Sequence, residues 1–398
     1  MRSRLIGALL CAATAACGGA TDPTATDPTV TDPPVTDPTA TDPPVTVDLD
    51  AVLAAKLRRY DAPGAIAVIA VGDRRISGQA GAADLDGTPI TADTRFRIGS
   101  ASKPITAALV LDAVQRGELS LDDLVDDLVP GLLTEDPPVP VRMLLDHTAG
   151  IFDQTNNPDI LDDIALLTDP AQAAQATELL DRALAGEAVI VPDTLLVAAA
   201  EAHGRDFPAG TDQQYSNLNY QVAAIVLEAV TGRSFAELLQ ERIVEPLGLR
   251  HTTVAPSDRS TPEFHGYGVD LDDGSLVDIT DELTFIGNGA SGGVISTVDE
   301  LATIMLAIVG GDLLEPTMRA EMRTPTELSE GTYGLGLATY GLTCGTFHGH
   351  EGAVNGTVSI ALVSDDGANA VVATVNLRNR TDPKMAALAD DLLCPALR

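Results

Sequence analysis

Residues 95–106 read RFRIGSASKPIT, so that Lys103 follows Ser100 by three positions. Lysine is rare in this chain of 398 residues, since the others are Lys56 and Lys384. A Ser-x-x-Lys pair is a weak signal by itself. Either Lys103 is a surface charge, or the serine requires an amine beside it.

A helix that begins at Ser100 and runs to about Gly117 would place Lys103 one turn later on the same face, within reach of the serine oxygen. Pro104 in the first turn favours this placement. A serine hydroxyl becomes a good nucleophile only when a base takes its proton, and lysine can do so only where burial or nearby cations keep it partly neutral. We therefore predict Ser100 as nucleophile and Lys103 as base.

A second group of polar residues follows in FPAGTDQQYSNLNY, residues 207–220, directly before a predicted helix. Tyr215 and Asn217 could project together toward Ser100, with the phenol as a second base and proton shuttle. Asn217 could bind a substrate carbonyl and steady Lys103. The alternative is a packed ring followed by a helix cap.

The third group is FHGHEGAVNGTVS, residues 347–359. We expect His350 and Gly352 at the start of a strand, with His350 as a switchable cation or hydrogen-bond donor and Gly352 allowing close approach of a substrate. The Ala353 and Ser100 amides would form an oxyanion hole. His348 is expected on the opposite face, without a role, and the alternative for His350 is a surface histidine.

The pattern of apolar residues predicts an α+β fold. A short helix near residues 49–57 and a hairpin over 65–81 are followed by helix-period segments in the ranges 105–117, 141–147, 177–186, 219–232, 234–248 and 297–311. Strand patterns return at 333–341, 357–367 and 369–377, before a last helix at 383–393. Strands at both ends predict one antiparallel sheet flanked by helices, with a mostly helical subdomain inserted.

Residues 1–17 are typical of an export signal, with a basic start, the apolar run LIGALLCAATAA and then Cys17. Small residues before Cys17 predict a lipobox, so we expect a lipid-anchored periplasmic or cell-surface protein. Plain secretion with cleavage near Ala16 and cytoplasmic retention are the alternatives. Residues 18–47 hold the Thr-Asp-Pro repeats of a linker in extended polyproline conformation, and the folded domain covers 48–398.

The formal net charge of −34 argues against nucleic acid as a partner, because phosphates would be repelled. It leaves the oligomeric state open. Cys344 and Cys394 are the cysteines of the exported domain, and two such residues are expected to pair in an oxidising compartment. Neither a metal site nor an organic cofactor is indicated, because the nucleophile and bases come from side chains.

The motifs SASK, YSN and HEG, in this order, resemble those of the penicillin-recognising serine hydrolases, which include class C β-lactamases, D-alanyl-D-alanine carboxypeptidases and related esterases. The segments LLDHTAGI (144–151) and ERIVEPLGLRHT (241–252) are similar to hallmarks of that family's helical subdomain. The resemblance is strongest to secreted DD-carboxypeptidases and implies the serine β-lactamase/DD-peptidase fold. It also supports pairing of Cys344 with Cys394.

The resemblance implies Ser100 as the acylated nucleophile, Lys103 and Tyr215 as the proton-handling pair, Asn217 as a substrate-binding residue and His350 as the third-motif cation. In carboxypeptidases of this family, threonines at the positions of Glu351 and Ala353 hold the substrate carboxylate. Their absence here makes carboxypeptidase activity a weaker expectation.

We expect a DD-carboxypeptidase-like enzyme acting on D-amino-acid peptides of peptidoglycan or on a related small molecule. The alternatives are an esterase, a D-aminopeptidase or a class C-like β-lactamase, and, outside enzymes, a non-catalytic cell-wall binding module.

Overall fold

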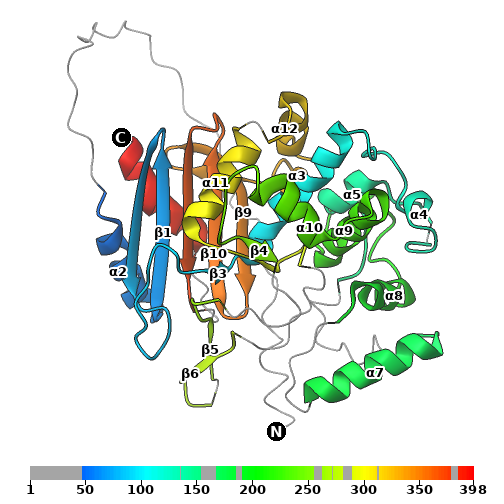
Figure 1. Ribbon diagram of the computed structural model, residues 1–398, viewed down its shortest axis with the longest axis horizontal. Coiled ribbons are helices and arrows are strands. Elements are labelled where there is room, and N and C mark those ends of the chain that lie inside the picture. The colour runs from blue at the N-terminus through cyan, green and yellow to red at the C-terminus, as the bar shows by residue number, and fades with distance from the viewer. Residues whose placement is uncertain are drawn as a thin grey trace, which may run out of the picture.

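The computed structural model describes residues 47–134, 136–153, 167–184, 191–254, 262–270, 272–280, 289–311, 313–377 and 384–398. The expected signal segment 1–17 with Cys17, and the repeat linker up to residue 46, lie outside the described residues. Figure 1 shows the sheet and the helical region side by side.

A six-stranded antiparallel sheet is assembled from both ends of the chain, in the order β2-β1-β11-β10-β9-β8. Its strands are β1 (Gly64–Val71), β2 (Arg74–Gly81), β8 (Ala338–Leu342), β9 (Gly345–Val354), β10 (Thr357–Ser364) and β11 (Asn369–Val375). The expected α+β class and the pairing of the two chain ends are confirmed. The sequence pattern had not separated β9 as a strand of its own.

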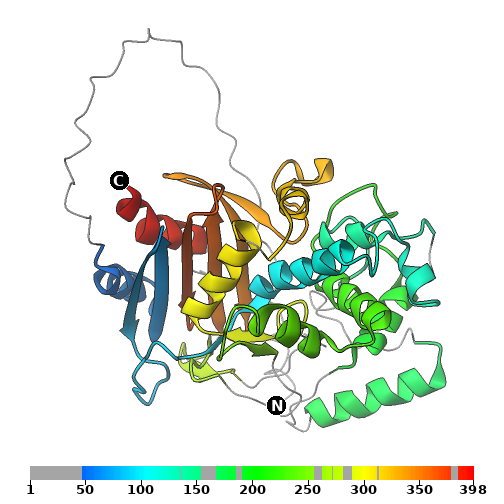
Figure 2. The same cartoon turned by 45° about the horizontal axis from the view of Figure 1, so that its top comes forward.

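Both faces of the sheet are covered by helices, because its central strands carry apolar residues on both sides. On β1, Ile66 and Val68 face a core with α11 (Val298–Val309), while Ala67 and Ile69 face a core with α2 (Leu49–Tyr60) and α13 (Met385–Leu393). The two views in Figures 1 and 2 show α2 and α13 on one side of the sheet and α11 on the other.

The inserted region is mostly helical, as expected. Its helices are α3 (Ser102–Gln115), α4 (Val125–Leu128), α5 (Val141–Leu145), α7 (Pro170–Leu184), α8 (Asp193–His203), α9 (Asn217–Thr231), α10 (Phe235–Leu239) and α12 (Pro316–Arg323). Short strands form two further sheets, β3 (Phe96–Arg97) with β7 (Val294–Ser296) and β4 (Thr253–Val254), and β5 (Tyr267–Val269) with β6 (Leu276–Asp278). Within the described part of the chain, no helix is both long and apolar enough to span a bilayer.

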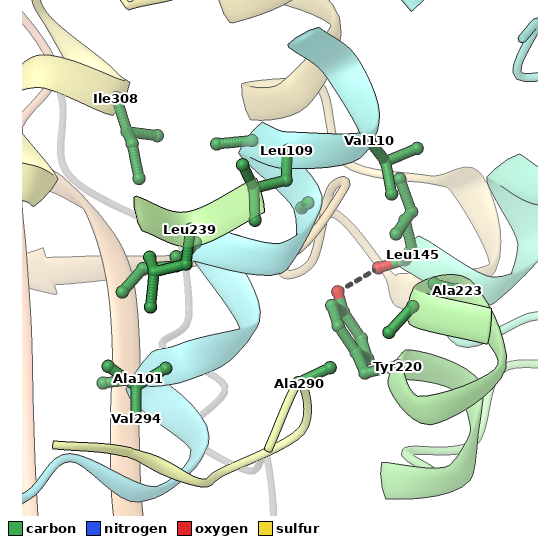
Figure 3. Close-up of a cluster of buried hydrophobic side chains, with 14 of the residues drawn as sticks. Ala101, Leu109, Val110, Leu145, Tyr220, Ala223, Leu239, Ala290, Val294 and Ile308 are labelled. Atoms are coloured by element: carbon green, nitrogen blue, oxygen red, sulfur yellow. Dashed lines mark hydrogen bonds between the residues drawn. The ribbon is translucent and has the colours of Figure 1, made fainter. Parts of the chain in front are cut away.

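Helix α3 is the central element, because every residue from Ser102 to Ala113 is buried. Figure 3 shows Leu109 and Val110 of α3 among the apolar side chains of neighbouring segments. Tyr220 of α9 stands in the same cluster and donates a 2.7 Å hydrogen bond to the Leu145 carbonyl. A helix enclosed on all sides can hold its first residues in fixed positions.

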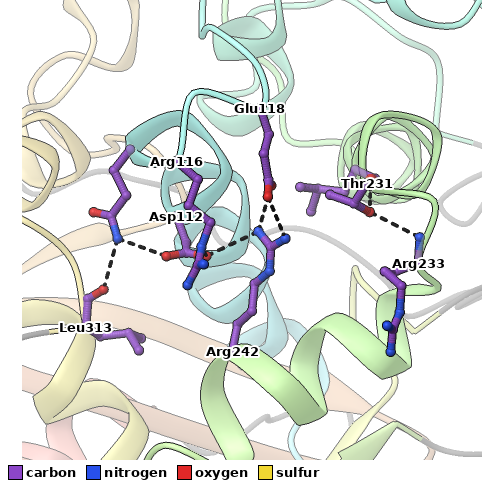
Figure 4. Close-up of polar contacts among 9 residues, drawn as sticks. Asp112, Arg116, Glu118, Thr231, Arg233, Arg242 and Leu313 are labelled. Atoms are coloured by element: carbon purple, nitrogen blue, oxygen red, sulfur yellow. Dashed lines mark hydrogen bonds and ion pairs between the residues drawn. The ribbon is translucent and has the colours of Figure 1, made fainter.

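The far end of α3 is held by charges. Arg242, in the π-helical turn η4 (Gln240–Val244), donates to Asp112 at 3.2 Å and to Glu118 at 2.8 Å, and Arg116 donates to the same Asp112 carboxylate at 2.6 Å. Figure 4 shows this group between α3 and the turn that carries Arg242. Both ends of the helix are therefore attached to other parts of the fold.

At its C-terminus the chain is joined to the sheet by a disulfide between Cys344 and Cys394, with sulfurs 2.02 Å apart. The expected pairing is confirmed. It connects the turn between β8 and β9 to the end of α13.

Candidate active site

Ser100 lies in a single 3₁₀ turn, η2 (Gly99–Ala101), that leads directly into α3. Lys103 is in the first turn of α3, and its Nζ donates to Ser100 Oγ at 3.2 Å. The lysine is fully buried, and burial lowers its pKa from 10.5 to about 7, against an opposing effect of the Asp153 carboxylate. A substantial fraction of this amine is therefore neutral near pH 7 and able to accept a proton.

Tyr215 precedes α9, and its hydroxyl donates a 2.8 Å hydrogen bond to Ser100 Oγ. The ring also lies 4.7 Å from Lys103 Nζ, measured to its centroid. Burial raises the pKa of the phenol well above its ordinary value. The expectation of Tyr215 as a second base is therefore corrected for this substrate-free state, in which the phenol is a neutral donor and Lys103 is the available base.

Asn217 starts α9 and accepts a 2.7 Å hydrogen bond from Lys103 Nζ through Oδ1. The third partner of Lys103 is the Ser291 carbonyl, also at 2.7 Å. The Nδ2 of Asn217 and its backbone N–H both donate to the buried carboxylate of Asp153, at 3.1 and 2.8 Å. Asp153 was missed by the sequence reasoning, although it lies two residues beyond the segment LLDHTAGI.

The third motif approaches the nucleophile through its backbone. A Cβ placed on Gly99 would lie 2.7 Å from the Ala353 nitrogen, and one placed on Gly352 would lie 2.0 Å from the Ile98 carbonyl oxygen. Strand β8 pairs with β9 only up to Gly349, so the last part of β9 runs beside η2 instead. The Ala353 and Ser100 amides are thus held in neighbouring segments, as an oxyanion hole requires.

His350 lies toward the end of β9 rather than at the start of a strand, and its ring is 6.0 Å from that of Tyr215. Its Nδ1 donates to the Glu351 carbonyl and its Nε2 accepts from the Tyr333 hydroxyl at 3.1 Å. Burial and the nearby Lys103 lower the pKa of His350 to about 3. The expected cation is therefore corrected to a neutral ring whose two nitrogens are already hydrogen-bonded.

The prediction that His348 points to the opposite face of the strand from His350 was wrong, because residues two apart in a strand point to the same face. His348 shares the face of His350, but its Nε2 lies 2.9 Å from Asp365 and its Nδ1 lies 3.4 Å from Thr339 Oγ1, so it is engaged away from Ser100.

His147 is a further residue that the sequence reasoning left without a role. It is fully buried, and its ring contacts those of Tyr215, Tyr220 and Tyr333 at centroid distances of 4.5, 5.3 and 5.0 Å. Its only signal in the sequence is its place in LLDHTAGI. Among the residues that the structure describes, no group of three or more His, Cys, Asp or Glu is arranged to hold a metal ion.

Comparison with known proteins agrees with this geometry. The Beta-lactamase family matches residues 49–393. A D-aminopeptidase of Brucella anthropi is 27% identical over 318 residues, which are 78% of this chain and 55% of the relative. Penicillin-binding protein 4 of Amycolatopsis lactamdurans is 30% identical over 176 residues, covering 43% of this chain and 39% of the relative. The chain thus spans about half the length, or less, of these relatives.

Among solved structures, a D-stereospecific amidohydrolase from Streptomyces sp. has a TM-score of 0.71 at 29% identity, covering 87% of this chain and 98% of that one. A D-amino acid amidase from Ochrobactrum anthropi SV3 has the same TM-score at 22% identity, covering 87% and 97%, and so shares the fold. Ser100, Lys103 and Tyr215 lie within hydrogen-bonding distance at the head of a buried helix, and the chain belongs to the Beta-lactamase family, with the fold of the penicillin-recognising serine hydrolases.

Proposed function

We propose that this hydrolase cleaves amides of D-amino acids, as a D-aminopeptidase or D-amino acid amidase does, through an acyl-enzyme on Ser100. The observation that carries the proposal is the lack of a cation along the strands beside the nucleophile. Residues 334–355, which include β8 and β9, contain neither lysine nor arginine, and His350 is neutral. A substrate with a terminal carboxylate would find no charge partner there.

Electrostatics separates this proposal from the carboxypeptidase expectation. Glu351 is half-buried next to His350, so a carboxylate bound along this strand would meet a like charge, whereas the ammonium of a free amino acid amide would be attracted. Strand alternation places Glu351 on the opposite face from His350, across from Ile360, so the proposal depends on the missing cation rather than on Glu351. DD-carboxypeptidase and class C-like β-lactamase activities both require a bound carboxylate and are therefore second choices.

The names of the related proteins support the same substrate class. Both the D-aminopeptidase and the D-stereospecific amidohydrolase described above act, by their names, on D-configured substrates. A shared fold leaves the choice of substrate to the strands and loops around the site.

The chemistry follows from the contacts around Ser100. Neutral Lys103 accepts the Ser100 proton while Oγ attacks the amide carbon, and the developing oxyanion is held by the Ser100 and Ala353 amides. The C–N bond then breaks, and the leaving amine takes up a proton delivered through the Tyr215 hydroxyl. Water attacks the resulting ester, loses a proton to the same pair, and releases the D-amino acid and free Ser100.

The proposal is tested with a matched panel of D- and L-alanine p-nitroanilide, D-phenylalanine amide, an acyl-D-Ala-D-Ala peptide and nitrocefin. We expect kcat/KM for the D-amides to exceed that for the L-amides and the acyl peptide by at least about tenfold. Intact-mass analysis should show an acyl adduct in the wild-type protein but not in Ser100→Ala. Turnover of the acyl peptide alone would overturn the proposal, and ligand binding that survives Ser100→Ala without turnover would favour a binding module.

We also propose that the protein is exported and anchored by lipid at Cys17. The signal-like segment 1–17 and the Cys344–Cys394 disulfide support an oxidising compartment. Palmitate labelling of the full chain in a bacterial host should be lost in Cys17→Ala. If label is absent from the wild-type protein and the mature chain begins near residue 17, plain secretion replaces this proposal.

A further inference from the structure

The segment Leu144–Asp153 has a conformation that calls for a specific reason. His147 adopts φ of 64°, in the left-handed region, and Gly150 follows with φ of 72°. A bulky residue in this region costs free energy, and such conformations persist where surrounding contacts hold them. Hydrogen bonds of both His147 and Asp153 lead to the second motif, at Ser216 and Asn217.

His147 holds the chain on both sides of Tyr215. Its carbonyl accepts the Gln214 N–H at 3.0 Å, and its Nδ1 accepts the Ser216 N–H at 3.2 Å. Because a backbone N–H can only donate, Nδ1 is the acceptor and the ring proton is on Nε2. The imidazole also packs against the Tyr215 ring, with centroids 4.5 Å apart.

Asp153 holds Asn217 in one orientation. Its Oδ2 accepts both the backbone N–H and the Nδ2–H of Asn217, so the carboxamide must present Oδ1 to Lys103. A carboxamide turned the other way would place an N–H group against the Lys103 amine, where two donors repel. Asp153 thus acts on the base through its neighbour as well as through its charge.

We propose that His147 and Asp153 are positioning residues of the reaction, with His147 fixing the Tyr215 hydroxyl on Ser100 and Asp153 fixing Asn217 on Lys103. Only the kinetic test of this proposal depends on the proposed function, because it needs a D-amide substrate. Among the residues that the structure describes, the side chains facing Lys103 come from four parts of the fold. They are Ser100 of η2, His147 and Asp153 of the loop after α5, Tyr215, Asn217 and Tyr220 before and in α9, and His350 of β9. Of these side chains, that of Asp153 is the carboxylate.

The first test reads Lys103 directly and needs no substrate. The lysines of the chain are Lys56, Lys103 and Lys384, so lysine-selective ¹³C labelling gives a simple NMR spectrum. The signal that is lost in Lys103→Arg is that of Lys103. In wild-type protein this signal should titrate near pH 7. Asp153→Asn keeps an acceptor oxygen but removes the charge, so the Lys103 midpoint should fall by at least about half a unit.

The matched control is Asp146→Asn, in the same segment. Asp146 is also buried, but its carboxylate bonds to Thr148. We expect this variant to lower stability and to leave the Lys103 midpoint where it is. An unchanged midpoint in Asp153→Asn, or an equal shift in both variants, would overturn the role of Asp153.

The second test separates positioning from packing at His147. His147→Asn places a carboxamide oxygen near the position of Nδ1, whereas His147→Phe fills the space without an acceptor. Rates are counted per reactive Ser100, titrated by phosphonylation with a fluorophosphonate, so that misfolded protein does not contribute. We expect kcat to fall at least tenfold in His147→Phe with KM little changed, and to recover mostly in His147→Asn.

Equal loss in the two His147 variants, with the Tyr215 loop intact by amide exchange, would overturn the positioning role. Should the wild-type protein hydrolyse no D-amide, the proposed function fails, but the rate at which the fluorophosphonate phosphonylates Ser100, with loss of fluoride, still compares the two variants. The lysine titration is independent of either result.

Discussion

Replacing Lys103 with methionine should change how the stability of the protein depends on pH. Methionine keeps an unbranched side chain of similar length while removing the buried amine. Lys103 Nζ is enclosed between Ser100, Asn217 and the Ser291 carbonyl, with no exposed side-chain surface. The cost of charging this amine in the folded state is therefore a property of the active site that can be measured by unfolding.

The magnitude follows from the lowered pKa of Lys103. The folded-state pKa is about 7 because of burial, against 10.5 for the free side chain. Between these values the unfolded chain binds a proton that the folded chain lacks, so the free energy of unfolding rises with pH across this window. The full window is worth about 5 kcal/mol, and the part between pH 6 and pH 9 is worth roughly 2.7 kcal/mol, at about 1.4 kcal/mol per pKa unit.

The assay is urea unfolding of the oxidised protein at pH 6, 7.5 and 9, followed by far-ultraviolet circular dichroism. We expect the wild-type protein to gain about 2.7 kcal/mol relative to Lys103→Met between pH 6 and pH 9. Lys384→Met removes an exposed lysine and should follow the wild type. A constant difference between wild type and Lys103→Met over this range would show that the amine titrates normally and would refute the reasoning.

Three further outcomes are expected. The acid limb of kcat/KM for wild-type protein should have its midpoint near pH 7, because only neutral Lys103 accepts the serine proton, and a limb below pH 5 would contradict this. Joint replacement of Cys344 and Cys394 by serine should lower the free energy of unfolding by about 4 kcal/mol, since the bridge closes a loop of 50 residues, and an unchanged urea midpoint would contradict it. Gly99→Ala should slow Ser100 acylation about a hundredfold, because the added methyl group would push the third-motif strand away. Gly117 also has a left-handed backbone but has open space around it, so Gly117→Ala should be acylated at the wild-type rate. Equal rates in the two variants would contradict the close contact between Gly99 and Ala353.

The sheet and the helices could be predicted from the sequence because each depends on a local pattern. Apolar runs bounded by turn residues mark β1, β10 and β11, and helical periodicity marks α9 and α11. Strand β9 lacked such a pattern, since its glycines and histidines interrupt the alternation. Its strand character comes from pairing with β10 on one side and β8 on the other, which no local window contains.

The residues that meet around Ser100 were predicted from the sequence, but their protonation was not. His350 and Tyr215 were expected to change their charge, a reasonable inference from residue type alone. Their burial beside Lys103 instead favours the neutral form of each. Burial of a side chain depends on how distant segments pack, so the motifs could indicate which residues meet but not which of them would be charged.

His147 and Asp153 were overlooked for a related reason. Neither donates or accepts a proton in any recognisable motif, and their contacts join positions that are more than sixty residues apart, as between Asp153 and Asn217. A residue that acts by orienting another can be recognised only when both are seen together. The left-handed backbone at His147 is the local sign of that task, and it too is visible only in the folded chain.

In the proposed mechanism, the reactivity of Ser100 depends on the burial of Lys103 against an acidic background. A formal net charge of −34 and the Asp153 carboxylate both favour a charged Lys103, and no neighbouring cation is needed to oppose them because loss of water around the amine has the larger effect. The helix that carries Lys103 is buried on every side and anchored at its far end by Arg242, so the amine cannot move out to be solvated. Any change that admits water to the first turn of α3 should therefore restore an ordinary lysine and silence the serine before the fold itself is lost.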